Sequence, residues 1–183
     1  MLFRSMWVFY LYCGIKWSII TFSGMKWEII NSSFYYLNTM LIGEYTHTLD
    51  DKNRLSLPMK FRKEMGKRVV IAPGLDSCLS IFTENEWEKI SAKLSESSML
   101  QTDNRSFSRF MFGQAVDTDV DGNGRILIPE HLRERSKLGS KVVVIGVQNR
   151  AEIWNETVWN KYKKGVDSQA DALAEKLGQV GVL

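Results

Sequence analysis

Short runs in which apolar and polar residues alternate, separated by turns rich in Asp, Asn and Gly, follow one another from Met40 onward. Alternation with a period of two is typical of strands, because successive side chains of a strand point to opposite faces. Brief β-branched runs are typical of buried strands. The pattern predicts eight short strands: Leu41–Leu49, Arg54–Leu57, Val69–Ala72, Cys78–Phe82, Ala115–Val120, Arg125–Ile128, Val142–Ile145 and Ala151–Trp154.

Four helices are predicted between and after these strands. Two short basic helices, Met59–Met65 and Glu130–Ser136, each follow a proline, which loses no needed N–H in the first turn of a helix. A capping box opens at Thr83 and predicts a helix to about Leu94. Asn155 occupies the equivalent position later in the chain, and its helix is expected to run on toward Leu177.

These elements occur twice in the same order, at an offset of 71 to 73 residues. The segment Asp50–Pro58 matches Asp121–Pro129, and Trp87 matches Trp159. The sequence therefore predicts an α+β fold with two copies of one unit, related by a pseudo-twofold axis. The expected boundaries are an extension at 1–39, a first unit at 40–96, a linker or helix at 97–110, and a second unit with a C-terminal helix at 111–183.

The extension at 1–39 differs in composition from the rest of the chain. It contains 11 of the 21 aromatic residues and only four charges, at Arg4, Lys16, Lys26 and Glu28. These charges interrupt every apolar run, so no stretch reaches the 18 or so residues that a membrane span needs. No convincing cleavage site marks a signal peptide. We expect no membrane association and interpret residues 1–39 as a non-native or disordered extension.

Catalytic and metal-binding patterns are missing from the sequence. Two cysteines and two histidines are too few for a disulfide framework or a cysteine-rich zinc site. His47, His131 and Cys78 are interpreted as surface or packing residues, and the Asp117–Asp121 segment lacks the glutamate that a calcium loop requires. We expect neither an enzyme nor a cofactor.

The duplicated Asp-x-x-x-Arg motif is the candidate site, formed by Asp50 with Arg54 and by Asp121 with Arg125. One interpretation is purely structural: the aspartate closes the turn and the arginine pairs with it. The other is DNA recognition, because a two-stranded ribbon fits the major groove and arginine can bind guanine with two hydrogen bonds. Turn residues that would share this contact are Lys52, Asn53 and Asn123.

Basic residues in and after the short helices can neutralise phosphates, although a solvated helix face explains them equally well. They are Lys60, Arg62, Lys63, Lys67, Arg68, Arg133, Arg135, Lys137 and Lys141. Net charge is +3 for the whole chain and +1 without residues 1–39, so bulk charge does not attract a partner and any basic surface is local.

The segments Leu41–Tyr45, Leu49–Pro58 and Asp121–Pro129 resemble the MraZ family, bacterial transcriptional regulators encoded at the head of the division and cell-wall gene cluster. The resemblance extends from Met40 to about Gly165. It implies two tandem SpoVT/AbrB-like swapped-hairpin units, a cytoplasmic, nucleoid-associated protein, and ring-shaped homo-oligomers. It also implies repression through direct repeats in double-stranded DNA upstream of the protein's own operon. The alternative is a ring-forming structural module that binds a protein partner.

The resemblance also suggests an origin for residues 1–39, since the family reads short repeats that contain TGG. Tryptophan is encoded by TGG, and Trp7, Trp17 and Trp27 lie ten codons apart. The pairs Cys13-Gly14 and Ser23-Gly24 permit the same triplet in the same ten-base phase. We therefore hypothesise that residues 1–39 are the operator itself, translated from a start codon placed too far upstream, with Met40 as the native start. Coincidence and a genuine aromatic leader are the alternatives.

The coding DNA tests this hypothesis, because a C at the third base of the Cys13 and Ser23 codons removes two of the five triplets. Mass spectrometry of the protein from its source is the second test, and a mature chain that begins at Met1 contradicts the hypothesis.

Overall fold

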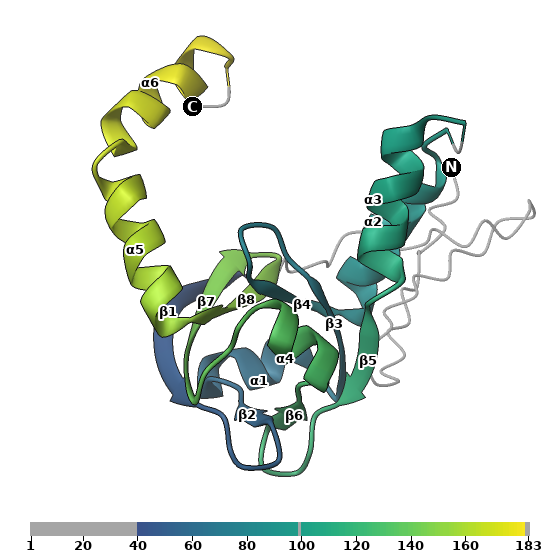
Figure 1. Ribbon diagram of the computed structural model, residues 1–183, viewed down its shortest axis with the longest axis vertical. Coiled ribbons are helices and arrows are strands. Elements are labelled where there is room, and N and C mark those ends of the chain that lie inside the picture. The colour runs from purple at the N-terminus through teal and green to yellow at the C-terminus, as the bar shows by residue number, and fades with distance from the viewer. Residues whose placement is uncertain (1–39, 99, 182–183) are drawn as a thin grey trace, which may run out of the picture. The chain divides into compact units, whose positions relative to one another are not determined.

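The computed structural model describes residues 40–98 and 100–181 (Figure 1). The expectations for residues 1–39, including the operator hypothesis, lie outside this range. Within it, every helix is too short or too polar to cross a membrane.

Six strands form one antiparallel sheet in the order β1-β7-β8-β4-β3-β5. The strands are β1 Leu41–Thr48, β3 Arg68–Pro73, β4 Leu79–Thr83, β5 Val116–Asp119, β7 Lys141–Gln148 and β8 Arg150–Asn155. β1 comes from the first repeat but pairs with β7 of the second, whereas β5 comes from the second repeat and pairs with β3 of the first. Equivalent strands therefore appear in the same order from either edge, which confirms the pseudo-twofold, swapped arrangement of two tandem units.

A second, two-stranded sheet joins β2, Arg54–Ser56, to β6, Arg125–Leu127. We call this pair of strands the ribbon. Leu55 lies opposite Ile126 at its centre, and both side chains are fully buried in the main core. The ribbon lies at one end of the fold, beyond the two short helices (Figure 1).

The short helices lie between the ribbon and the large sheet. They are α1, Met59–Met65, and α4, Glu130–Arg135, and they begin after the two prolines as expected. Phe61 and Met65 of α1 and Leu132 of α4 are buried against inward-facing strand residues such as Ile71 and Val144. This shared core fixes the ribbon to the sheet.

The opposite face of the sheet is covered by longer helices. In the first repeat α2, Glu84–Ser95, and α3, Thr102–Phe112, cover Ala72 and Phe82. In the second repeat α5, Glu156–Asp167, covers Val143 and Trp154. The predicted caps are confirmed, because Thr83 Oγ1 accepts a hydrogen bond from the N–H of Glu86 and Asn155 Oδ1 accepts one from that of Thr157.

The single helix expected from Asn155 toward Leu177 is wrong. The chain ends α5 at Asp167 and begins a separate helix, α6, at Ala170, which continues to Gln179. Ser168 Oγ donates a 2.8 Å hydrogen bond to the carbonyl of Gly165 at this break. Serine side chains that bond the backbone in this way compete with the regular helical pattern, and glycine weakens it further.

Candidate nucleic-acid interface

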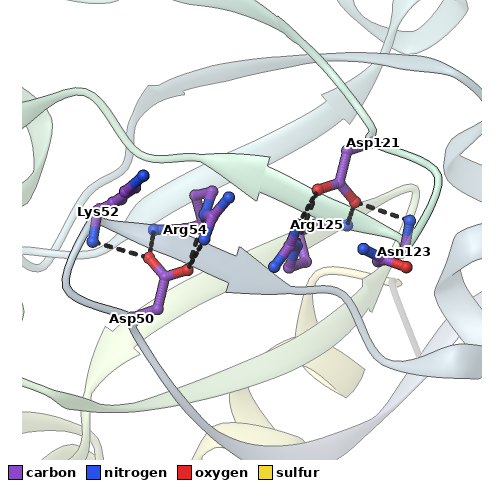
Figure 2. A network of polar contacts seen from close by, with 6 residues as sticks. All are labelled: Asp50, Lys52, Arg54, Asp121, Asn123 and Arg125. Carbon is purple, nitrogen blue, oxygen red and sulfur yellow. Dashed lines mark hydrogen bonds and ion pairs between the residues drawn. The ribbon is translucent and has the colours of Figure 1, made fainter.

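Each turn that carries the duplicated motif is closed by its aspartate (Figure 2). Asp50 Oδ1 accepts hydrogen bonds of 2.9 Å from the backbone N–H groups of Lys52 and Arg54. Asn53 has a φ of 56°, a left-handed conformation that asparagine tolerates better than most residues. Gly124 has a φ of 75° at the matching position of the second turn. The two turns therefore have the same left-handed backbone conformation at this position.

The arginine that follows each turn binds the same aspartate through its side chain (Figure 2). Arg54 Nε and Nη2 each lie 2.7 Å from Asp50 Oδ2. In the second repeat the corresponding distances between Arg125 and Asp121 are both 2.8 Å. Each guanidinium is thus held along one side by its aspartate, and its opposite side, which includes Nη1, faces away from that carboxylate.

The two aspartates are stabilised in their charged form. The pKa of Asp50 is lowered mainly by the hydrogen bond from the backbone N–H of Arg54, with further contributions from the Arg54 side chain and the N–H of Lys52. The pKa of Asp121 is lowered in the same way by Arg125 and Asn123. Both carboxylates are therefore ionised at neutral pH and keep the arginines in place.

The pairing of the ribbon puts both arginines on its outer face. Arg54 lies opposite Leu127, and Ser56 lies opposite Arg125. Because directly opposite residues share a face, these four side chains point away from the core, while Leu55 and Ile126 point into it. The arginine side chains are 34% and 29% exposed, so part of each is accessible from outside.

Each turn is also held by the other repeat, which the sequence did not reveal. The N–H of Leu57 donates to the carbonyl of Gly124, and the N–H of Ile128 donates to the carbonyl of Asn53, both at 2.9 Å. Asn53 Nδ2 also donates to Glu130 in α4. These bonds join the turns, the ribbon and the short helices into one unit.

The same family model matches each of the two repeats. The family model "MraZ protein, putative antitoxin-like" matches residues 40–110 and again residues 111–179. The chain belongs to the MraZ family.

Named MraZ relatives match this chain over almost their whole length. The transcriptional regulator MraZ of Caldanaerobacter subterraneus is 43% identical over 143 residues, which cover 78% of this chain and all of that protein. The protein of the same name from Moorella thermoacetica is 44% identical over 138 residues, covering 75% of this chain and 96% of the relative. The relative from Caldicellulosiruptor saccharolyticus is 41% identical over 143 residues and is also matched in full, over 78% of this chain.

Several of the basic residues predicted from the sequence to contact phosphates already interact with other residues of this MraZ chain. Arg68 lies 3.3 Å from Asp119 and 3.6 Å from Asp117 across β3 and β5. Arg133 pairs with Glu130, Arg135 lies over the ring of Phe110, and Arg62 Nε donates to the carbonyl of Leu57. The lysines are exposed: Lys60, Lys63, Lys67, Lys137 and Lys141.

The remaining candidate chemical groups do not assemble into a site. No cluster of metal-ligating side chains occurs among the residues that the structure describes. Cys78 is buried, which raises the pKa of its thiol to about 12, so it is a poor nucleophile. Among the described residues, the two arginines of the duplicated motif share the outer face of the ribbon.

Proposed function

We propose that this chain is a DNA-binding transcriptional regulator that reads double-stranded DNA with the outer face of the β2–β6 ribbon. The observation that carries the proposal is the pair Arg54 and Arg125, which project from one exposed face and are each oriented by an aspartate. The names of the MraZ relatives, which are transcriptional regulators, support the same function.

The geometry suits direct recognition of bases. A two-stranded ribbon fits the major groove of B-DNA, where guanine presents two acceptors, N7 and O6, to an arginine. Asp50 and Asp121 hold the side of each guanidinium and leave its end for these acceptors. Holding the arginine in advance reduces the conformational entropy that is lost on binding.

Phosphate contacts would come from the turns and the exposed lysines. Lys52 and Asn123 occupy the same position in the two turns, where they flank the ribbon. The proposed interface also includes the residues that shape these turns, Asp50, Asn53 and Asp121. The side chain of Asn53 must break its hydrogen bond to Glu130 before it can reach DNA. Because such contacts displace counterions, affinity is expected to fall steeply as salt rises.

The chain is further proposed to act as a ring-shaped homo-oligomer, and the helices support this. Trp87, Ile90 and Leu94 of α2 pack against a buried cluster of Ala72, Phe82 and Met111, the last of which belongs to α3. Their counterparts in the second repeat include Tyr162 and Val166, which lie exposed on α5 and line an apolar groove with Leu173 of α6. A second copy of the chain would cover this groove as α3 covers α2.

A ring would explain how one near-neutral chain binds DNA tightly. Many identical ribbons on one particle would meet successive direct repeats, so that avidity supplies the affinity that one ribbon lacks. In this proposal the repeats lie upstream of the protein's own coding sequence, and binding represses the division and cell-wall gene cluster that includes its own promoter. The protein then works in the cytoplasm in association with the nucleoid.

The alternative function is a ring-forming module that binds a protein partner and does not read DNA. A gel-shift titration with the upstream DNA at two salt concentrations distinguishes the two. Arg54→Ala and Arg125→Ala are each expected to weaken binding at least tenfold without changing the oligomer. Arg150→Ala is a matched control, because Arg150 is a strand arginine paired with Glu152 and its side chain is 35% exposed. Unchanged DNA affinity in both ribbon variants would contradict the proposal.

A further inference from the structure

Leu127 is an apolar side chain in the middle of a polar, exposed surface. It is 52% exposed and lies directly opposite Arg54 on the outer face of the ribbon. Its pseudo-twofold equivalent is Ser56, which lies opposite Arg125. The two halves of the ribbon thus carry identical arginines but different neighbours, one apolar and one polar.

An exposed leucine beside a guanine-binding arginine fits one particular feature of the major groove. Each thymine presents its C5-methyl group there, and apolar side chains recognise it by direct contact. Opposite residues of an antiparallel pair have Cβ atoms about 4.5–5.5 Å apart, and neighbouring base pairs are about 3.4 Å apart. Leu127 therefore lies within reach of the base pair beside the one that Arg54 meets.

We infer that Leu127 packs against the C5-methyl group of a thymine next to the guanine bound by Arg54. The inference rests on the proposed function and adds a specificity determinant to it. Ser56, at the equivalent place beside Arg125, can bond to several bases and imposes no such requirement.

The contact gives each site a direction. A ribbon with two identical halves would bind both orientations of a duplex equally and would favour a palindrome. The difference between Leu127 and Ser56 makes the two orientations unequal, because only Arg54 has a thymine-contacting residue opposite it. A chain with nearly symmetric halves can then recognise repeats that all point the same way.

The test replaces thymine by deoxyuridine, which removes only the C5-methyl group. A duplex that carries the DNA immediately upstream of this protein's coding sequence is first footprinted with the full-length protein. Each protected thymine is then changed to deoxyuridine in turn, and affinity is measured by gel shift. At one thymine in each repeat we expect a loss of about fourfold, the factor that burial of a single methyl group provides.

Variants locate this effect on the ribbon. In Leu127→Ser the original duplex is expected to bind at least fourfold more weakly, and deoxyuridine at the sensitive position is expected to cause no further loss. Ser56→Ala should keep the full deoxyuridine penalty. Ile42→Ser is the matched control, because Ile42 is a strand residue of the large sheet that is 62% exposed, and it should behave as the unchanged protein.

The outcomes separate this inference from the proposed function. If the unchanged protein does not bind the duplex, both are overturned. If it binds and no single deoxyuridine weakens the complex, or if Leu127→Ser keeps the same penalty, only the thymine contact is overturned. The deoxyuridine scan on the unchanged protein remains decisive even if a variant folds poorly.

Discussion

Leu57 donates a backbone hydrogen bond of 2.9 Å to Gly124, although the two residues belong to different repeats. Its counterpart joins Ile128 to Asn53 at the same distance. Each turn that carries an aspartate–arginine pair is therefore shaped partly by the other half of the chain. A substitution in one turn should therefore alter the conformation of both strands of the ribbon.

Gly124→Ala is expected to destabilise the fold by about 1–2 kcal/mol, because an alanine in the left-handed region is strained. Its Cβ would also meet the side chain of Arg62 and displace the bond that Arg62 Nε makes to Leu57. Urea denaturation measures the effect. Gly122→Ala is the control, since Gly122 lies in the same turn with open space around it and should change the unfolding free energy by less than about 0.5 kcal/mol. Equal losses in both variants would contradict this account.

Acid should weaken the fold through Asp50 and Asp121. Their pKa values in the folded state are lowered from 3.8, so their stabilising contribution is complete above that pH and is lost as pH falls through the lowered values. The double variant Asp50→Asn, Asp121→Asn should be less stable than the unchanged protein at pH 6 and should approach it below pH 3.8. Urea midpoints at several pH values measure this difference. A constant difference down to pH 2.5 would exclude the proposed linkage.

Lys52→Ala is expected to weaken DNA binding by a similar factor for all sequences, because a lysine–phosphate contact carries no base information. The slope of log affinity against log salt should become shallower by about 0.9 for each phosphate that is no longer neutralised. Gel shifts across a salt series provide both quantities. Lys163→Ala is the comparison, since Lys163 pairs with Glu44, and its slope should stay unchanged. A changed sequence preference in Lys52→Ala would argue for base contact instead.

Leu173→Asp should disrupt self-association, because it places a charge in the apolar groove between α5 and α6. Light scattering coupled to size-exclusion chromatography should show a smaller particle at the same protein concentration. Met59→Asp adds the same charge at an exposed residue of α1 outside this groove, and should leave the particle size intact. If Leu173→Asp assembles normally, the groove is not the contact between copies.

Local elements were well predicted from the sequence, and their causes are local. Proline and the apolar spacing after it define α1 within the residues predicted. Thr83 and Asn155 mark the starts of α2 and α5 through caps that involve only the next few residues. The break after Asp167 was not predicted, because no proline and no strong turn signal lies there. The feature found at the break is a hydrogen bond from the Ser168 side chain to the carbonyl of Gly165.

The long-range part of the site could not be derived in the same way. The sequence identified the aspartate–arginine pairs, since they lie four residues apart in both copies. It did not show that β2 and β6 pair with each other, which alone brings Arg54 and Arg125 to one face. Nor did it show that Asn53 is bonded to Glu130, because side-chain partners 77 residues apart depend on the register of the whole fold.

The exchange of β1 and β5 between the repeats has a consequence for how this chain can evolve. A single repeat could build the same sheet only by pairing with an identical copy, and every substitution would then appear on both sides at once. Joining the copies in one polypeptide removes that constraint while keeping the shared core. Ser56 and Leu127 can therefore differ, and the fused chain can acquire an asymmetry that no homodimer of a single repeat could have.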